Sequence, residues 1–458
     1  MKREPALAVL DIGKTAARVV GVAEDGRIAF SRRHACRSLP APPYPHLDVD
    51  DTFAALCDGL AEMGQELVVT GVMPVAHGAA AALLGDGSLA LPVMDYEAEV
   101  PDAVSASYDD EAPAFSETLS PRLPAGLNLG RQLAWMEAAE PARFAAGSEL
   151  VPFAQYWAWR FCGTAVSEVS SLGCHTDLWN PMTGTFSSLS TRHGWDRRFA
   201  PLRAAGDVIA TIDAGIARRL GLPQGLPVHC GLHDSNAAAW RCIGPGDGRA
   251  AILSTGTWFV ALRPGGPLDA LDPTSDMLAN VAPDGTPVPS IRFMGGREAE
   301  MIADPATLPL ASGDSLARVL ASGAMALPCF AAAGGPFRNR TGRVVDAGET
   351  FDASACAALA ILYLALVSDW CLERLGRTDD AYVTGPFAGV PLFSAILAAL
   401  RPPTRVCIDT ATDGTPLGAA LVARGRRGDG NGFILATPYP GKDLAVHRAR
   451  WRQAIGAS

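Results

Sequence analysis

Several features that mark other classes of protein are missing from this chain of 458 residues. None of its ten cysteines belongs to a Cys-x-x-Cys pair, and a chain of this length does not need disulfides to be stable. We therefore expect reduced thiols and a cytoplasmic protein. The Gly-x-x-x-x-Gly-Lys-Ser/Thr loop is absent, and no Gly-x-Gly-x-x-Gly follows an early strand. The second absence argues against an NAD(P)-dependent dehydrogenase, which a fluorescence titration with nicotinamide cofactor would test.

An excess of basic charge and a long apolar run are also lacking. The net charge of −10 argues against nucleic acid as a partner, because phosphate backbones are bound with surplus Lys and Arg. The longest apolar stretch, residues 355–367, has thirteen residues, which is too short to cross a bilayer. The N-terminal sequence MKREPALAVLDIG is charged and then strand-like, unlike a signal peptide. We expect no membrane partner.

Two strand–turn–strand units are present, one near the start of each half of the chain. The first comprises strands at residues 7–10, 18–22 and 27–31, with turns at 11–15 and 24–26. The second comprises strands at residues 250–253 and 258–262 around a turn at 254–257. Their similarity suggests a duplicated architecture. The Gly/Pro-rich segment 243–249 separates them, and we place a domain boundary there, giving residues 1–243 and 244–458.

Helical patterns alternate with the strands in both halves. Helices are predicted at residues 51–63, 315–320, 352–375, 389–400 and 418–424, and further strands at 381–384 and 405–408. This alternation is typical of α/β domains with helix-covered sheets. A basic, helix-like segment at 444–455 ends the chain, and we expect it to pack back on the body.

The two polar turns are candidate phosphate sites. Each turn exposes backbone N–H groups, and a glycine allows a phosphate to approach closely. The first turn offers Asp11, Gly13, Lys14 and Thr15, with Asp11 placed to hold a magnesium ion through water. The second offers Ser254, Thr255, Gly256 and Thr257. The first turn alone is equally well explained as an ordinary hairpin, and the second turn alone is weaker evidence still. Two such turns in matching positions, however, could bind a polyphosphate from both sides.

The segment GLHDSNAA, residues 231–238, is a candidate catalytic site. Asp234 precedes a small, helix-favouring run, so it lies at a helix N-terminus where the helix dipole keeps it ionised. An ionised aspartate can take the proton of a hydroxyl that attacks phosphorus. The structural alternative is a helix cap, the commoner role of Asp and Ser. His229 and His233 are four residues apart, but no third ligand is evident, which argues against a metal.

Taken in order, the motifs DIGKT, GLHDSNAA, STGTW, VTGPFAGVPLF and DGTPLGAALVA make the chain resemble the FGGY family of carbohydrate kinases over nearly its whole length. The resemblance implies two actin-like (ribonuclease H-like) ATPase domains with a cleft between them. It is nearest to the rhamnulokinase and L-fuculokinase branch, on the stretches SEVSSLGCHTDLWNP (residues 167–181) and RFMGGRE (residues 292–298).

The resemblance also implies roles for individual residues. Asp234 matches the catalytic base, and with Asp11 it would hold Mg²⁺ through water. The two turns match the phosphate sites, and Gly385, Pro386 and Phe387 match the adenosine site. The sugar would be bound by His77, Gly78, Asp95, Tyr96, His233, Asp234 and Ser235, with Glu168, His175, Thr176 and Asp177 as weaker candidates.

Two positions depart from the family pattern. Where the adenosine motif often reads Gly-x-x-x-x-Asn-Pro, Val390 stands before Pro391, so a polar contact to the nucleotide is missing and strict use of ATP is in doubt. Lys14 replaces a smaller residue in the first turn, which is compatible with phosphate.

The predicted activity is therefore transfer of the terminal phosphate of ATP, with Mg²⁺, to a hydroxyl of a small ketose. Candidates are L-rhamnulose, L-fuculose, D-xylulose and L-ribulose, which the sequence does not distinguish. The alternative is a non-catalytic or chaperone-like ATPase of the actin superfamily, which ATP turnover unaffected by any sugar would favour. A homodimer is the default assembly.

Overall fold

The computed structural model describes residues 3–243, 249–331, 334–345, 351–411, 413–428 and 432–456. By internal contacts the chain divides into two compact units. The first comprises Met1–Gly244, Ala279–Pro287 and Asp413–Asp429, and the second Pro245–Leu278, Val288–Thr412 and Gly430–Ser458. Residues 244–248 of the Gly/Pro-rich segment lie outside the described residues, and the domain boundary between residues 243 and 244 stays a prediction.

A mixed sheet forms the centre of the first unit. Its strands, in order across the sheet, are β12 (Val208–Thr211), β13 (Pro227–His229), β6 (Val68–Ala76), β1 (Pro5–Ile12), β2 (Ala16–Ala23) and β3 (Ile28–Ala35), with β14 (Leu232–His233) also paired to β6. β1 runs antiparallel to β2 and parallel to β6. The first strand–turn–strand unit is confirmed, because the chain turns at residues 13–15 as the alternating apolar pattern requires.

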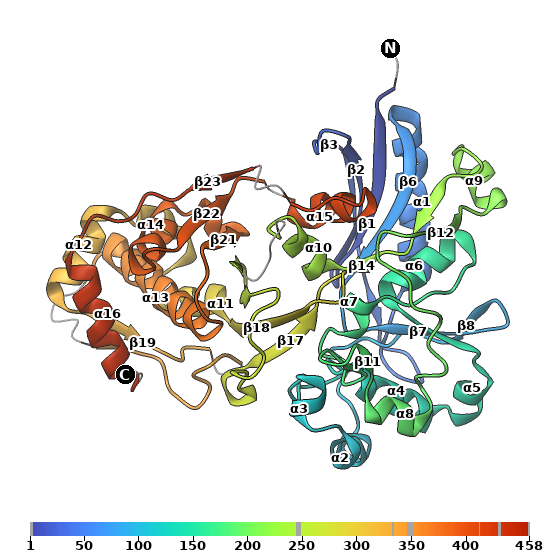
Figure 1. The fold of residues 1–458 in the computed structure, drawn as a ribbon, viewed down its shortest axis with the longest axis horizontal. Coiled ribbons are helices and arrows are strands. Elements are labelled where there is room, and N and C mark those ends of the chain that lie inside the picture. Colours follow the sequence, from blue (N-terminus) through green and yellow to red (C-terminus); the bar gives the residue numbers. More distant parts are fainter. Residues whose placement is uncertain are drawn as a thin grey trace. The chain divides into compact units, whose positions relative to one another are not determined.

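Helices cover both faces of this sheet (Figure 1). α1 (Val49–Glu66) begins where the Asp48 side chain accepts the N–H of Asp51, and it buries Leu56, Leu60 and Met63 in the core shared with the sheet. α6 (Phe153–Cys162) contacts β6 and β13, whereas α10 (Asp234–Trp240) and α15 (Gly414–Ala423) contact each other and the sheet. The predicted helices at 51–63 and 418–424 are thus confirmed with longer bounds.

The rest of the first unit forms a second core. A small sheet of β8 (Ser88–Leu91), β7 (Ala81–Gly85) and β9 (Glu149–Pro152) packs with short helices. These helices are α2 (Asp102–Glu111), α3 (Phe115–Thr118), α4 (Leu129–Ala139), α5 (Pro141–Ala146), α7 (Val169–Leu172) and α8 (Ser188–His193). A further short helix, α9 (Ala214–Leu220), packs beside α1 in the core of the large sheet. Short strand pairs join β4 (Ser38–Leu39) to β5 (His46–Leu47) and β10 (Trp179–Asn180) to β11 (Thr185–Phe186).

The second unit is built on another mixed sheet. The strands of this sheet, in order, are β17 (Met277–Val281), β18 (Pro287–Phe293), β16 (Phe259–Leu262), β15 (Ala250–Ser254), β21 (Asp380–Thr384), β22 (Arg405–Asp409) and β23 (Phe433–Leu435). The end of β17 and the start of β18 fall in the segment Ala279–Pro287 that is assigned to the first unit. β15 is antiparallel to β16 and parallel to β21, as β1 is to β2 and β6. The order β18-β16-β15-β21-β22-β23 therefore repeats the order β3-β2-β1-β6-β13-β12 of the first unit. The duplicated two-domain α/β architecture predicted from the sequence is confirmed.

The core of the second unit surrounds one long helix, α13 (Ala353–Arg374), which begins at the predicted cap, Asp352. Its neighbours are α11 (Gly295–Ile302), α12 (Gly313–Ser322), α14 (Pro391–Leu400), α16 (Asp443–Ala454), the short helices η1 (Pro273–Ser275), η2 (Pro305–Leu310) and η3 (Pro386–Gly389), and the strand pair β19 (Met325–Leu327) and β20 (Arg343–Val345). The expected packing of the C-terminal segment is confirmed, because Trp451 of α16 is buried and its Nε1–H donates to the Ala326 carbonyl at 2.9 Å.

α13 also bears on the membrane argument. At 22 residues it is longer than the apolar run from which the sequence analysis excluded a span, so the argument from length was wrong. Within the described residues it is the one helix long and apolar enough to cross a bilayer, and 89% of its most apolar window is buried inside the protein. Burial of this kind is typical of the core helix of a globular domain.

Candidate functional site

The first polar turn follows β1, and its aspartate is paired with an arginine. In the β1–β2 hairpin, Asp11 lies directly opposite Arg18. The Arg18 guanidinium donates to Oδ2 of Asp11 at 2.5 Å and to Oδ1 of Asp413 at 2.6 Å. Burial raises the pKa of Asp11, Arg18 lowers it, and the carboxylates of Asp234 and Asp413 raise it further. The carboxylates of Asp234 and Asp413 therefore both lie within electrostatic range of Asp11, beside the Arg18 cation.

Lys14 is part of an ion pair in the structure. Its ammonium contacts the Asp95 carboxylate, donates to Ser38 Oγ at 3.1 Å, and lies 5.3 Å from the centre of the Tyr96 ring. These contacts lower the pKa of Asp95, although burial opposes them. The structure thus joins a predicted phosphate ligand, Lys14, to two predicted sugar ligands, Asp95 and Tyr96. Thr15, the last residue of the turn, has an exposed side chain.

Asp234 is the first residue of α10 and is about three-quarters buried, with 28% of its side chain exposed. Oδ1 accepts the Ser235 backbone N–H at 2.6 Å and the Ser235 hydroxyl at 3.2 Å, and it lies 3.2 Å from His233 Nε2. Oδ2 has no contact of this kind among the described residues. Burial raises the pKa of Asp234, while His77 and Ser235 lower it. The expected helix-dipole effect is therefore opposed by desolvation, and a raised pKa strengthens a carboxylate as a proton acceptor.

His233 is buried beside Asp234 and is held in one orientation. Its Nδ1 accepts the Asn236 amide at 3.0 Å, so in the neutral ring the hydrogen is on Nε2, which faces Asp234 and lies 3.3 Å from the sulfur of Cys174. Burial lowers the pKa of His233 to about 4, so the ring is neutral at pH 7. A Cβ on Gly78 would lie 2.9 Å from His233 Nε2, so glycine is needed there for packing.

His77 follows β6 on the same side of the first unit. Its Nδ1 pairs with the Gly78 carbonyl at 2.8 Å, and its ring contacts Tyr96 and Phe153 with centroid separations of 5.2 and 4.8 Å. Burial lowers the pKa of His77, whereas the Asp234 charge raises it. The sequence-predicted residues Asp11, His77, His233 and Asp234 thus come together, as the end of β6 lies beside β1 and β14.

The first part of the stretch SEVSSLGCHTDLWNP, residues 167–181, is hydrogen-bonded to the backbone of this cluster at His233. Glu168 is fully buried and caps α7 by accepting the N–H groups of Ser170 and Ser171. Ser170 Oγ donates to Glu168 at 2.7 Å and accepts the His233 N–H at 3.2 Å. Burial raises the pKa of Glu168 to about 7. Its contacts are structural, and they hold the backbone just before Asp234.

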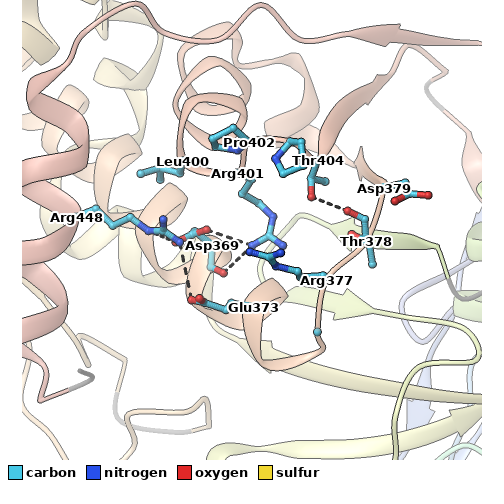
Figure 2. A pocket seen from close by; sticks show the side chains of 12 residues that line it. Asp369, Glu373, Arg377, Thr378, Asp379, Leu400, Arg401, Pro402, Thr404 and Arg448 are labelled. Carbon is cyan, nitrogen blue, oxygen red and sulfur yellow. Dashed lines mark hydrogen bonds and ion pairs between the residues drawn. The ribbon is translucent and has the colours of Figure 1, made fainter.

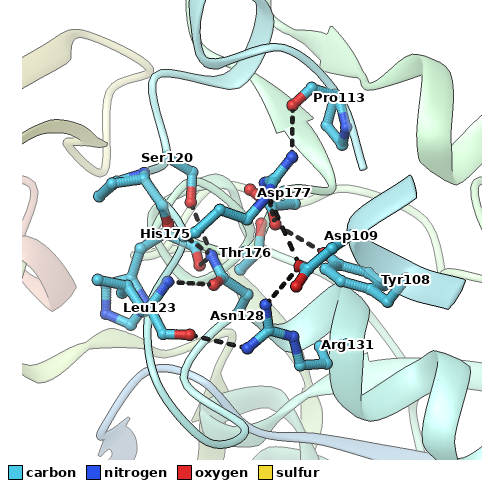
Figure 3. A network of polar contacts seen from close by, with 12 residues as sticks. Tyr108, Asp109, Pro113, Ser120, Leu123, Asn128, Arg131, His175, Thr176 and Asp177 are labelled. Carbon is cyan, nitrogen blue, oxygen red and sulfur yellow. Dashed lines mark hydrogen bonds and ion pairs between the residues drawn. The ribbon is translucent and has the colours of Figure 1, made fainter. Parts of the chain in front are cut away.

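His175, Thr176 and Asp177 belong to a separate polar network, shown in Figure 3. His175 Nδ1 pairs with the Leu127 carbonyl at 2.8 Å, and the Thr176 hydroxyl donates to the Leu172 carbonyl. The buried Asp177 carboxylate accepts from Tyr108 at 2.6 Å and from Arg122 at 3.1 Å. These interactions tie α2 and α4 to the segment after α7, which favours a structural role for all three residues.

The second polar turn follows β15, and its central threonine is engaged within the fold. Thr255 donates its N–H and its hydroxyl to the Thr384 carbonyl, at 2.9 and 2.5 Å, and its hydroxyl accepts the Phe387 N–H at 3.1 Å. A Cβ on Gly385, where φ is +83°, would lie 2.0 Å from the Thr255 carbonyl oxygen. Thr255 and Gly385 therefore join the second turn to the predicted adenosine turn.

The remaining predicted residues of this region divide into exposed and core positions. Ser254 and Gly256 are half-buried and Thr257 is exposed, as are Gly385 and Pro386. The Phe387 ring is buried against Phe259 and Phe393. Val390 caps α14, with Pro391 in the first turn of that helix. The Gly296 N–H donates to the Gly256 carbonyl at 3.1 Å, so the stretch RFMGGRE supports the second turn.

The carboxylates of the first unit fit a divalent cation. Asp11, Asp234 and Asp413 carry three negative charges, of which Arg18 neutralises one. Carboxylate oxygens with water are the ligands that Mg²⁺ prefers. Among the described residues no group of three or more His, Cys, Asp or Glu is placed to hold a metal ion by itself, so an ion at these carboxylates would need further ligands from water or substrate.

Arg18 and Asp413 are the site residues that the sequence analysis missed. Arg18 could have been found, since a hairpin that turns at residues 13–15 places Asp11 opposite position 18. Asp413 was inside a quoted motif, DGTPLGAALVA, but nothing local to it indicates a partner 395 positions away.

Comparison with known proteins identifies the family. Residues 247–430 match the model of the carbohydrate kinase FGGY C-terminal domain. The structure superposes on a carbohydrate kinase from Novosphingobium aromaticivorans with a TM-score of 0.91 and 39% identity, covering 100% of both chains. It superposes on the ligand-bound xylulose kinase from Lactobacillus acidophilus with a TM-score of 0.79 and 16% identity, covering 99% of both chains.

A curated relative is more distant. L-fuculokinase of Salmonella typhi is 26% identical over 287 residues, and this match covers 58% of each chain. The full-length likeness at 39% identity and the family match agree with the duplicated actin-like fold. The chain belongs to the FGGY family of carbohydrate kinases, phosphotransferases that act on an alcohol group and use ATP.

Proposed function

We propose that this protein transfers the terminal phosphate of ATP to a hydroxyl of a small ketose, with Asp234 as general base. The observation that carries the proposal is the state of the Asp234 carboxylate. Its Oδ1 is fixed by Ser235 and His233, whereas Oδ2 has no hydrogen-bond partner among the described residues. An oriented, partly desolvated carboxylate with one unengaged oxygen can accept the proton of the sugar hydroxyl as the hydroxyl oxygen attacks phosphorus.

The neighbouring side chains then have distinct tasks. His233, neutral at pH 7, donates from Nε2 toward Asp234 and fixes the carboxylate plane. His77, Tyr96 and Asp95 offer a ring face, a hydroxyl and a carboxylate, the kinds of groups that bind sugars. Lys14 belongs with this sugar-binding set, because its ammonium is engaged by Asp95.

Phosphate binding is assigned to groups with available donors. In the first turn this is the exposed Thr15, and in the second Ser254, Gly256 and Thr257. The Gly13 N–H is donated to the Ala16 carbonyl at 2.9 Å, so Gly13 contributes only the absence of a side chain, which leaves room for a phosphate. Thr255 is a positioning residue, because its N–H and hydroxyl are donated to Thr384. Gly385 and Pro386, exposed beside this turn, would contact the adenosine.

Mg²⁺ would be held by Asp11 and Asp234, with Asp413 contributing negative charge, and when bound it would neutralise charge on the transferring phosphoryl group. Arg18 positions Asp11 and Asp413 and offsets their mutual repulsion.

The acceptor is proposed to be a ketose because an L-fuculokinase and a xylulose kinase are among the proteins that the chain resembles. A coupled ADP-release assay over L-fuculose-, L-rhamnulose-, D-xylulose- and L-ribulose-type acceptors and polyols, ranked by kcat/KM, tests this. We expect one ketose to exceed the polyols by at least about tenfold, since one mismatched hydroxyl commonly costs more than about 1.4 kcal/mol. ATP turnover unaffected by every acceptor would instead support a chaperone-like ATPase.

A further inference from the structure

A cavity of about 360 Å³ lies in the second unit, away from the residues assigned above (Figure 2). It opens at the amino ends of two parallel strands: Thr378 and Asp379 directly precede β21, and Thr404 directly precedes β22. The predicted adenosine turn, at Gly385, follows the opposite end of β21. Five residues of strand separate the two places, about 17 Å at roughly 3.3 Å per residue. The cavity is therefore separate from that turn.

Beneath the cavity is a buried ion cluster with surplus positive charge. The Asp369 carboxylate, 1% exposed, is bound by Arg401, Arg448 and Arg452 at 3.1, 2.7 and 3.0 Å. Arg452 also binds Glu373, so three guanidinium groups share two carboxylates. Arg401 has 8% of its side chain exposed and contacts Asp369 through Nη1, while its Nε has no partner among the described residues. The cluster thus carries an excess of one positive charge and an unused donor.

The rim of the cavity adds a further cation and hydroxyl groups. Arg377 is exposed and has no carboxylate within ion-pair distance among the described residues, whereas Asp379 pairs with Arg249 at 3.6 Å. Thr378 is 7% exposed, and its Oγ1 has no hydrogen-bond partner in the described part of the chain. A buried hydroxyl without a partner is costly, so a ligand group or water that satisfies it is favoured.

From this juxtaposition we propose that the cavity is a second ligand site, which binds a phosphate group carried by a small polyhydroxylated molecule. Arg377 and the charge of the arginine cluster suit a phosphate, because guanidinium forms charge-assisted hydrogen bonds with phosphate oxygens. The carboxylates Glu373 and Asp379 at the rim accept hydroxyl hydrogens, and Leu400 and Pro402 supply apolar surface for the carbon skeleton. The volume lies within the range of about 300–1,000 Å³ for small-molecule sites.

The test is calorimetric titration of the full chain with D-glucose 6-phosphate, inorganic phosphate and D-glucose. We expect the sugar phosphate to bind, inorganic phosphate to bind at least fivefold more weakly, and glucose not to bind measurably. Arg377→Gln should weaken binding of the sugar phosphate about tenfold, the effect of losing one charge-assisted hydrogen bond. Thr378→Val, which removes a hydroxyl without a partner, should weaken it about threefold while keeping the fold.

The matched control is Arg343→Gln, since Arg343 is also exposed and in the second unit but does not line the cavity. It should leave binding unchanged. Equal weakening by Arg377→Gln and Arg343→Gln would show non-specific attraction and overturn the proposal, as would sugar phosphate binding that Asp234→Asn abolishes and Arg377→Gln does not affect. Inorganic phosphate binding as tightly as the sugar phosphate would overturn the role of the hydroxyl groups.

Discussion

The two sheets have the same strand order, but the turns that follow their central strands are built from different chemistry. In the first unit the turn after β1 is held by ion pairs, Arg18 with Asp11 and Lys14 with Asp95. In the second unit the turn after β15 is held by hydrogen bonds of one threonine and by close backbone packing at Gly385. The two units therefore share a sheet topology but hold the equivalent turns differently, with ion pairs in the first unit and with hydrogen bonds and backbone packing in the second.

The strongest way to test this division is Asp234→Asn. If the first unit carries the proton transfer, turnover should fall about 100- to 10,000-fold, the range for loss of a positioned base. The fold should persist, because asparagine still accepts the Ser235 N–H. Asp443→Asn, an exposed change in the first turn of α16, is the control and should keep the wild-type rate. A rate above about a tenth of wild type in Asp234→Asn would reject the base assignment.

Gly385→Ala should break the second turn by sterics alone. The new Cβ would lie 2.0 Å from a backbone oxygen at a residue with φ of +83°, so we expect a loss of about 3 kcal/mol or more in unfolding free energy. Gly256→Ala is the matched control, because its nearest neighbour would be 3.7 Å away. It should keep stability within about 1 kcal/mol while raising KM for ATP. Urea unfolding followed by tryptophan fluorescence measures the unfolding free energy of both variants. Equal losses in Gly385→Ala and Gly256→Ala would contradict the steric argument.

The buried histidines of the two units sharpen the comparison. His233 has its Nδ1 satisfied by Asn236, whereas Nε2 of His447 in α16 has no partner among the described residues. Burial lowers the pKa of His447 to about 4, so below pH 6.5 the unfolded chain binds a proton that the folded one does not. Stability is therefore lost as pH falls from about 6.5 to 4. Between pH 7 and 5 wild type should lose about 2 kcal/mol more than His447→Gln.

Denaturant unfolding at the two pH values measures this difference. The lowered pKa of His233 likewise makes stability fall as pH falls. Glu168, with its pKa raised to about 7, instead contributes stability that is lost as pH rises through that value. An identical pH dependence in wild type and His447→Gln would show that His447 is not the source.

Lys14→Met gives the smallest expected effect and decides which ligand this lysine serves. Because Lys14 is bound to Asp95, the variant should raise KM for the sugar about tenfold and leave KM for ATP within about twofold. The combined variant with Asp95→Asn should be less impaired than the sum of the single changes. A rise in KM for ATP alone would return Lys14 to the phosphate site.

Local pattern predicted the parts of the fold that local forces determine. The alternation around residues 7–22 and the cap at Asp352 specify a hairpin and a helix without any distant contact, and both are present. Lys14–Asp95 and Arg18–Asp413 could not be read this way, because each joins segments that meet only after the sheet has formed. Asp11–Arg18 is the intermediate case, set by hairpin register alone.

The position of α15 has a consequence for how the protein is made. α15 belongs to the first unit although it follows β22 in the chain, and a Cβ on its Gly418 would lie 1.7 Å from the Ala237 carbonyl oxygen of α10. Arg424, just after α15, donates to the Val22 and Ala23 carbonyls. During synthesis on the ribosome, α10 therefore emerges long before α15, its packing partner, has been made. A nascent chain released near residue 243 would expose that uncovered surface to chaperones and proteases.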